Sequence, residues 1–546
     1  MATPVDSKPR VEKSVAHQVD HDVEQTLKGE EAAREAMERG QGKSGLEHLT
    51  PFETIKTFKF ATAVGVIASF CAATEGYQAV MNGSIIANAG FVHQFATKIN
   101  AEGEQYLESP IITGWSMVMT IGQMIGLAGA PFISGNYGRK WAMYTTMIFL
   151  LASVLAESLA RNWGVWLVGK MLAGFGVGGI QAIFQPYLPE IAPVRIRGAI
   201  TMLYQFWWAL GSFMGQIALR EINERTPYKY LTAIYTQWGH VGFMFIIFLV
   251  LPETPSWYAS KGREADAKKT LKWLYGRAEI YDVDHQYNLL MMLLEHERAL
   301  AIEQNREHWY AIFQGINGRR TLIAGWCPLA MQLIGMKVFL TFGTYFFQQA
   351  GISQPFTVKC ITSSIQIAGV IFNILTIEKV GRRPLACIAC TVCWICCIVV
   401  GILGVTPETN ATTYVFVLFA CIWNFCLISL GAAAAGTVGE ISNERLRPYT
   451  AGFAQLMSCL CGIIMDVLVP YMTNDNKWGW GYKTGWFYAG TGAIATAGAW
   501  YLIPETKART AAELDELFDR KIPAWNFGKT ETATQQLIRS KDVVEK

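Results

Sequence analysis

Charged residues are scarce in this sequence. Asp, Glu, Lys and Arg make up 16% of the 546 residues and hydrophobic residues 51%, whereas about a quarter of an average soluble chain is charged. The formal net charge is only +3, so the basic surface that binds nucleic acid is lacking and we expect no such partner. A cleavable signal peptide is also lacking, because residues 1–50 are polar and the first apolar run begins near Phe60. We therefore expect an integral membrane protein that keeps its first apolar run.

Signatures of enzymes are missing too. The sequence has no recognisable nucleophile–base pair, phosphate loop or metal-ligand cluster, so we expect neither an enzyme nor a metal or organic cofactor. Five of the twelve cysteines fall in CIACTVCWICC (387–397), but that run has no His or acidic residue, and we interpret them as small packing residues. GFGVGG (174–179) lies inside an apolar run, which favours tight helix packing over nucleotide binding.

Long apolar runs dominate the chain instead. A helix needs about 20 apolar residues to cross a bilayer. Twelve segments qualify: 60–86, 110–134, 141–160, 164–187, 198–219, 233–251, 321–347, 357–378, 385–404, 412–436, 449–471 and 484–503. The sequence therefore predicts an all-α membrane protein with twelve transmembrane helices in two halves of six. Its expected parts are a tail at 1–54, a half at 55–252, a linker at 253–320, a half at 321–505 and a tail at 506–546.

Basic residues sort the loops into two sides. Arg139, Arg197, Arg382, Arg447 and their basic neighbours fall in alternate loops, and the loops between them are poorer in Lys and Arg or balanced by acids. The positive-inside rule then places both termini and the linker in the cytoplasm, and we expect the plasma membrane as location. NAT at 410–412 would lie outside the cell, which makes Asn410 a candidate glycosylation site, with chance occurrence as the alternative.

Short motifs recur at matching places in the two halves. NYGRK (136–140) corresponds to EKVGRRP (378–384), PEIAPVRIRG (189–198) to GEISNERLRP (439–448), and PET ends each half. Arg in such turns can pair with carboxylates at helix ends and hold the cytoplasmic side shut until the halves rock. Membrane anchoring explains one such motif but not a set in register. The predicted cytoplasmic gate consists of Arg139, Glu190, Arg197, Glu378, Arg382, Glu440 and Arg447.

Together these motifs resemble the sugar porter family of the major facilitator superfamily, over roughly residues 55–520. Within that family, TYFFQQAGI (344–352) and VPYMTNDNKWGWGYKTGWFYAG (469–490) look most like fungal α-glucoside (maltose-type) permeases. The resemblance implies a transporter, secondary active or facilitative, that moves a sugar or glycoside through the bilayer by alternating access. We expect it to act as a monomer.

The resemblance also implies a pocket between the halves, lined by amides that both donate to and accept from sugar hydroxyls. Gln205, Gln332, Gln366 and Gln455 fall at the amide positions of the fifth, seventh, eighth and eleventh spans. Asn373 shares a helix face with Gln366. Any of these amides can alternatively join neighbouring helices.

The seventh span departs from the family, because Met331 replaces a glutamine and Lys337 an asparagine. The tenth span departs too, because Ala432 and Ala435 stand where the family has a proline and an aromatic residue. Loss of an amide and of an aromatic wall should weaken hexose binding and widen the pocket. A lysine inside the membrane needs a partner, and Glu75, Asp466 or an acidic substrate are the candidates. Alternatively, Lys337 lies near the extracellular mouth.

Energy coupling stays open at this point. Proton-coupled members of the family carry GYD in the first span, where the Asp titrates against a basic residue of the fourth. Here Gly76 and Tyr77 precede Gln78, which has no exchangeable proton, and Lys170 occupies the basic position. Either Glu75, directed towards Lys170 or Lys337, couples transport to H⁺, or the protein is a facilitator.

Two functions compete with transport of a sugar. A membrane sensor that binds sugar without useful flux would suit the altered pocket. An exporter of a polar secondary metabolite would suit a pocket that contains a lysine. The intact gating motifs favour a transporter over a sensor.

Overall fold

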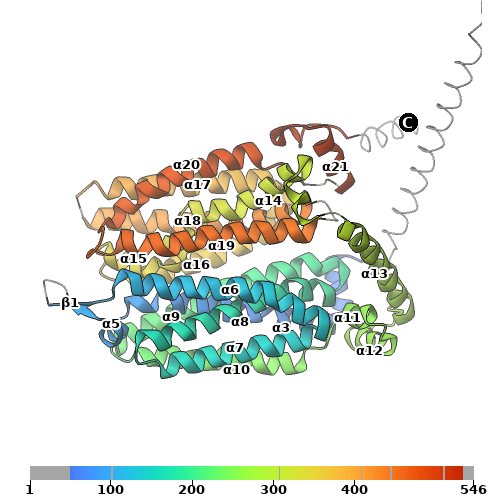
Figure 1. The fold of residues 1–546 in the computed structure, drawn as a ribbon, viewed down its shortest axis with the longest axis horizontal. Helices are drawn as coiled ribbons and strands as arrows, with labels where there is room; N and C mark the ends of the chain where they lie inside the picture. The colour runs from blue at the N-terminus through green and yellow to red at the C-terminus, as the bar shows by residue number, and fades with distance from the viewer. Residues whose placement is uncertain are drawn as a thin grey trace, which may run out of the picture.

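The computed structural model describes residues 49–99, 103–306, 308–407, 409–442, 446–507, 509 and 511–532. These residues are almost wholly helical. The strands among them form one antiparallel hairpin of β1 (Lys98–Ile99) and β2 (Gln105–Tyr106), in which Lys98 lies opposite Tyr106. Figure 1 shows the long helices as two stacks lying side by side, one from each half of the chain.

The first stack contains the N-terminal membrane helices. Its first span is broken into α3 (Lys59–Ser69), α4 (Cys71–Gly83) and the 3-10 turn η1 (Ile85–Ala87). The other spans are α6 (Ser109–Tyr137), α7 (Arg139–Leu159), α8 (Trp163–Ile191), α9 (Arg197–Arg225) and α10 (Tyr230–Val250). Shorter elements flank them: α2 (Pro51–Thr57), α5 (Ala89–Phe95) and η2 (Val194–Ile196). The linker forms α11 (Pro255–Ser260), α12 (Glu264–Tyr275), α13 (Val283–Arg306) and η3 (Trp309–Phe313).

The second stack contains the C-terminal membrane helices. Its first span is also broken, into α14 (Gly315–Leu333), the π-helical turn η4 (Lys337–Thr341) and α15 (Gly343–Gln349). The others are α16 (Pro355–Val380), α17 (Arg382–Leu403), α18 (Asn410–Ile441), α19 (Arg447–Thr473) and α20 (Thr484–Leu502), with η5 (Gly481–Lys483) before α20. The chain continues through α21 (Ala511–Asp519) and η6 (Ala524–Asn526).

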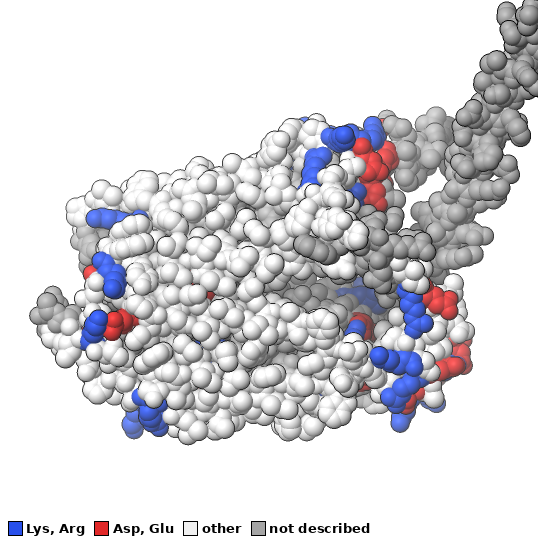
Figure 2. Space-filling view, in the orientation of Figure 1, with Lys and Arg blue, Asp and Glu red and all other residues white. Residues whose placement is uncertain are grey.

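The twelve expected membrane helices are all present. Nine of the described helical segments, with α3, α4 and η1 counted as one, are long and apolar enough to cross a bilayer. The remaining three spans are α9, the α14–α15 pair and α20. Figure 2 shows Lys, Arg, Asp and Glu gathered at the two ends of the bundle and a broad uncharged band between them, as a bilayer requires.

Glycines let the helices of the first stack approach closely. A Cβ at Gly174 of α8 would lie 2.2 Å from Met119 O of α6, and one at Gly178 would lie 2.2 Å from Gln123 O. The packing interpretation of GFGVGG is therefore confirmed. In the second stack, Cys390, Cys393 and Cys397 are buried in an apolar core cluster, where small polarizable side chains fill space between helices.

The break in the seventh span has its own backbone chemistry. α14 ends at Leu333, and Gly335 follows with a left-handed backbone at φ 97°. The carbonyl of Ile334 accepts a hydrogen bond from Trp423 Nε1 at 3.0 Å, and that of Leu333 accepts one from Thr491 Oγ1 at 2.6 Å. Because the bilayer offers no water, carbonyls freed by a break must be satisfied by protein. The span expected over 321–347 is therefore present, but as α14 and α15 joined by a π-helical turn and not as one continuous helix.

The two halves meet at the end of the bundle opposite the linker, which we call the outer end. Ser109 Oγ donates to Pro470 O at 3.0 Å, and Asn474 Nδ2 donates to Leu107 O at 3.2 Å. Deeper in the bundle, Thr344 Oγ1 donates to Ser84 Oγ at 2.9 Å. Between described residues, every hydrogen bond that joins the halves lies in this outer portion, and at the linker end no ion pair joins them either.

Candidate functional site

Two matched ion pairs lie at the linker end, one in each half. Arg139 Nη2 pairs with Glu190 Oε1 at 2.9 Å, and Arg382 Nη2 pairs with Glu440 Oε1 at 3.0 Å. Each arginine begins a helix, α7 or α17, and each glutamate lies in the last turn of the next helix, α8 or α18. The structure thus brings together four of the predicted gate residues, and each pair braces two helices of the same half.

A second carboxylate completes each cluster. Gly138 and Gly381 precede the two arginines with φ 109° and 103°, and a Cβ there would lie 2.3 Å from Glu253 Oε2 or 2.5 Å from Glu505 Oε2. Glu253 accepts from the backbone N–H of Arg139 at 2.9 Å, and Glu505 accepts from the corresponding N–H in the other half at 3.1 Å. A carboxylate at a helix N-terminus satisfies free N–H groups and the helix dipole. The predicted gate omitted both glutamates, although the repeated PET motif marks them.

The other predicted gate residues are not brought into these clusters. Arg197 is exposed at the first residue of α9 and forms no ion pair with a described residue. The side chains of Glu378 and Arg447 lie outside the described residues. Their roles stay predictions.

Glu75 is buried and held by neutral donors. Its carboxylate accepts hydrogen bonds from Tyr204 Oη of α9 and Gln181 Nε2 of α8, both at 2.6 Å. The expectation that it points towards Lys170 or Lys337 is wrong. Lys170 lies eleven residues before Gln181 in the same helix, a separation of about 16 Å along the helix axis. Glu75 therefore forms no ion pair among the residues described.

Lys170 has a different partner, Glu157 of α7. Their Nζ and Oε1 atoms are 3.0 Å apart, and both side chains are completely buried. Glu157 Oε2 accepts from Gln237 Nε2 of α10 at 2.9 Å, and Gln237 Oε1 accepts from Gln78 Nε2 of α4 at 2.6 Å. A buried polar chain thus runs through four helices of the N-terminal half. Sequence reasoning missed Glu157, although an acidic residue within an apolar run was a visible signal.

Lys337 lies just after the break in the seventh span and pairs with Asp466 of α19, at 2.9 Å between Nζ and Oδ2. Asp466 was one of the candidate partners. The same carboxylate oxygen accepts from Thr120 Oγ1 of α6 at 2.7 Å, so the pair reaches the other half. Gly462 of α19 lies beside both side chains, because a Cβ on it would be in ordinary contact with Lys337 Cε at 3.5 Å and with Gln332 Nε2 at 3.6 Å.

Three amides of the C-terminal half are buried without full hydrogen bonding. Gln332 donates weakly to Ser458 Oγ at 3.5 Å, and its Oε1 has no partner among the described residues. For Gln366 and Asn373 of α16, neither the oxygen nor the nitrogen of the amide has a partner within the described part of the chain. Each orphaned buried group costs about 1–3 kcal/mol, so these amides are candidates for ligand contacts.

The remaining candidates are on more open surfaces. Gln205 of α9 and Gln455 of α19 are exposed, and Gln455 Nε2 lies 3.6 Å from Cys459 Sγ in its own helix. Asn410 is the exposed first residue of α18, and the sequon's Thr412 takes part in the cap of that helix. Glycosylation there stays a prediction.

This arrangement suits binding and movement of a neutral polar solute. The amides can donate and accept hydrogen bonds, and the membrane lysines Lys170 and Lys337 are each paired with a carboxylate. Among the described residues no group of three or more His, Cys, Asp or Glu is placed to hold a metal ion.

Comparisons with known proteins agree with this picture. A family model described as "Sugar (and other) transporter" matches residues 64–518. The general alpha-glucoside permease of Saccharomyces cerevisiae is 27% identical over 90% of this chain and 80% of its own length. The MFS transporter fmqE of Aspergillus fumigatus is 27% identical over 84% of this chain and 86% of its own length.

Solved structures show the same fold. The xylose transporter XylE from E. coli, in an inward-open conformation, matches with a TM-score of 0.68 over 84% of this chain and 100% of its own, at 17% identity. The predicted fold, the resemblance to sugar porters and the prediction of a transporter rather than an enzyme are confirmed. Because the family model covers most of the sequence, the protein belongs to the sugar (and other) transporter family.

Proposed function

We propose that this transporter carries an α-glucoside, such as a disaccharide, across the plasma membrane by alternating access and in symport with a proton. Relatives support the substrate class, since the general alpha-glucoside permease and the maltose permease MAL31 of Saccharomyces cerevisiae are 27% and 26% identical over 90% and 92% of this chain. The arabinose-proton symporter of Bacillus subtilis, 25% identical over 87% of this chain, supports a proton as coupling ion. We expect a monomer to be the working unit.

The contrast between the two ends of the bundle is the main support for alternating access. Hydrogen bonds join the halves at the outer end, whereas at the linker end Arg139–Glu190 and Arg382–Glu440 each stay within one half. Two internally braced halves can rock about a central site if the outer bonds break while the inner braces hold. The linker end is the cytoplasmic end by the positive-inside rule, so this conformation has its outer side closed.

The buried amides favour a neutral, hydroxyl-rich solute. Gln366 and Asn373 offer donors and acceptors that nothing in the described chain uses. The charge of Lys337 does not require an acidic substrate, because Asp466 already balances it. A glycoside supplies several hydroxyls at once, each able to donate and accept.

Glu75 is a better candidate than Glu157 for the coupling proton. Protonating Glu157 would leave Lys170 charged and unpaired in the membrane interior, which is costly. The partners of Glu75 among the described residues, Tyr204 and Gln181 foremost, are neutral donors, so it can take up a proton without breaking an ion pair there. Rearrangement of α9 against α4 would change those hydrogen bonds and with them the proton affinity, which symport requires.

Transport by the purified protein in liposomes tests both parts of the proposal. We expect wild type to exchange labelled maltose in counterflow and to accumulate it under an inward proton gradient. Glu75→Gln should keep counterflow and lose accumulation. Glu295→Gln, which changes an exposed linker carboxylate, is the matched control and should keep both.

Each other result has a distinct meaning. Accumulation that survives Glu75→Gln would show that another group binds the proton. Counterflow without accumulation in wild type would make the protein a facilitator. Binding without flux for every glycoside tested would favour a sensor.

A further inference from the structure

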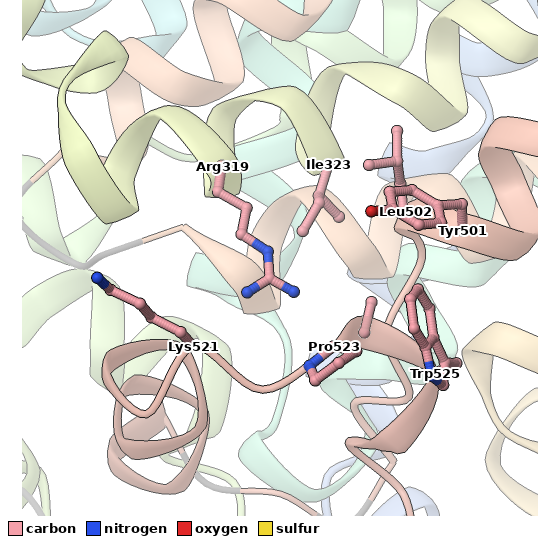
Figure 3. A pocket seen from close by; sticks show the side chains of 8 residues that line it. Arg319, Ile323, Tyr501, Leu502, Lys521, Pro523 and Trp525 are labelled. Atoms are coloured by element: carbon pink, nitrogen blue, oxygen red, sulfur yellow. The ribbon is translucent and has the colours of Figure 1, made fainter.

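A cavity of about 260 Å³ lies at the cytoplasmic end of the C-terminal half, away from the substrate path. Three segments enclose it: the start of α14, the end of α20 and the stretch that follows α21. Figure 3 shows Arg319 reaching between these segments, with Tyr501 and Trp525 on the opposite side. The lining consists of Arg319, Ile323, Tyr501, Leu502, Lys521, Pro523, Ala524 and Trp525.

One side of the cavity carries unbalanced positive charge. Arg319 donates one hydrogen bond, to Ile522 O at 2.8 Å, and neither Arg319 nor Lys521 forms an ion pair with a described residue. Their neighbours differ in this respect. Arg320 pairs with Asp515 at 2.6 Å, and Arg520 pairs with Glu516 at 2.9 Å. Of these four cations, the two that line the cavity are thus the ones without an ion-pair partner among the described residues.

The other side is apolar and aromatic. Ile323 and Leu502 belong to the membrane helices α14 and α20, and the rings of Tyr501 and Trp525 lie 5.2 Å apart. Tyr501 is 64% exposed and Trp525 42% exposed. Because α20 ends at Leu502, the cavity lies where that helix leaves the bilayer. Exposed aromatic residues at this depth are typical of the headgroup layer.

We propose that the cavity binds an anionic phospholipid of the cytoplasmic leaflet. The phosphate would lie between Arg319 and Lys521, and the glycerol and first acyl carbons against Tyr501 and Leu502. Basic pockets between membrane helices on the cytoplasmic side suit such headgroups, which are plentiful in that leaflet. An amphiphile matches a cavity with one cationic and one apolar side better than a free anion does.

The backbone at Lys521 explains how this lysine comes to line the cavity. Lys521 has φ 54°, and it is the one non-glycine residue with a positive φ in the described chain. Glycine or asparagine adopts this conformation at lower cost than lysine does. This conformation ends α21, because it lets the N–H of Ile522 donate to Leu517 O at 3.2 Å, and it directs the chain back along the cavity that Lys521 lines.

A bound lipid would also tie the C-terminal segment to the bundle. Leu514, Leu517 and Phe518 of α21 pack with Ile323 and Ile441. Arg319 and Ile323 are on the bundle side of the cavity, whereas Lys521 and Trp525 are on the segment side. A headgroup that contacts both sides stabilises the docked segment, so lipid binding should raise the thermal stability of the protein.

Thermal unfolding of the full chain in neutral detergent tests this proposal. Dioctanoyl phosphatidylserine should raise Tm in a saturable way, whereas dioctanoyl phosphatidylcholine and inorganic phosphate should not. Arg319→Gln and Lys521→Gly should each weaken the apparent affinity for phosphatidylserine about five-fold. Lys521→Gly also relieves the backbone strain, so it should fold at least as well as wild type without lipid.

Arg520→Gln is the matched control, because it removes the same charge one residue away from the cavity lining and should not change the affinity. An equal effect of phosphatidylcholine, or an unchanged affinity in Lys521→Gly, would overturn the proposal. An equal effect of inorganic phosphate would show a simple anion site and would also contradict it. None of these outcomes depends on which sugar is transported.

Discussion

At the cytoplasmic end the two halves are built alike, but in the membrane interior they differ. At this end, each half has a glycine with positive φ, followed by an arginine that pairs with a glutamate at about 3 Å. In each half a second glutamate accepts from the backbone N–H of that arginine and so caps the helix that the arginine begins. Inside the membrane each half also holds one Lys–carboxylate pair. Glu157–Lys170 is enclosed within the N-terminal half, whereas Lys337–Asp466 shares a hydrogen bond with Thr120 of the other half.

This difference distinguishes an ion pair that stays intact when the halves rock from one that has to rearrange. A pair with no contact to the other half holds its own helices together in every conformation. A pair that touches the other half has to change partners when the outer end opens. The repeated ends therefore provide the same mechanical brace twice, while the interior gives the N-terminal half a rigid core and the C-terminal half an adjustable contact.

The largest effect is expected at the enclosed pair. Glu157→Gln leaves the Lys170 ammonium buried without a counter-charge and should lower the free energy of unfolding by about 3–5 kcal/mol. The double variant Glu157→Gln/Lys170→Met removes both charges and should recover most of that loss. Thermal unfolding in detergent, with Asp466→Asn for comparison, measures the difference between the halves.

Asp466→Asn should destabilise less, because the Lys337 side chain is 12% exposed while that of Lys170 is completely buried. Equal stability of Glu157→Gln and wild type would mean that the enclosed pair is not what makes the N-terminal half rigid. A larger loss in Asp466→Asn than in Glu157→Gln would reverse the comparison.

Structural features that depend on residues close together in the chain could be predicted from the sequence. Apolar length gave all twelve spans, and fixed spacings such as Glu190 before Arg197 located the cytoplasmic turns. Contacts between distant helices could not be read in this way. Which carboxylate meets Lys170 depends on the rotation of α7, α8 and α4 about their axes, and a shift of one residue rotates a side chain by about 100°. Sequence reasoning therefore directed Glu75 towards Lys170 and missed Glu157, which is the actual partner of that lysine.

The broken seventh span shows a second kind of limit. Hydropathy across Leu333–Phe339 is high enough for a continuous helix, and nothing local shows that Trp423 and Thr491, far along the chain, satisfy the freed carbonyls. The predicted substrate-site residues on either side of the break, Gln332 and Lys337, followed from family resemblance alone. That Gly462 of α19 lies beside both side chains could not be predicted in this way.

A smaller effect, on the affinity for maltose, is expected when the amides are replaced. Among the amides, those of the C-terminal half should have the largest effect. Gln332→Ala, Gln366→Leu and Asn373→Leu should each weaken maltose affinity by about 1–3 kcal/mol, because sugar hydroxyls would lose a partner. Gln205→Ala should fall at the lower end of that range, since the Gln205 side chain is exposed and not buried among unpartnered groups. Equilibrium binding of maltose to the purified variants measures this.

The apolar variants also distinguish binding from packing. If Gln366 and Asn373 do not contact substrate, replacing these unpartnered amides with leucine should leave affinity unchanged and raise Tm, because a buried orphaned group is removed. That combination would place the substrate site elsewhere. Loss of affinity at unchanged Tm supports the pocket.

The smallest effect is expected at the matched braces, where the halves should respond alike. Arg139→Gln and Arg382→Gln each remove one charged contact of about 3 Å while the capping carboxylates Glu253 and Glu505 remain. Because the pairs are partly exposed, at 22% for each arginine side chain, solvent screens them and the loss is modest. We expect maltose counterflow to slow by about three- to ten-fold in each variant, with affinity unchanged within a few-fold, since the braces lie away from the amides. Arg263→Gln, in the exposed linker, controls for loss of a surface arginine. Rates of counterflow alongside equilibrium binding separate the two quantities. If one variant slowed flux strongly and the other did not, the braces would not be mechanical equivalents, and the likeness of the two cytoplasmic ends would be one of sequence and geometry without a shared role.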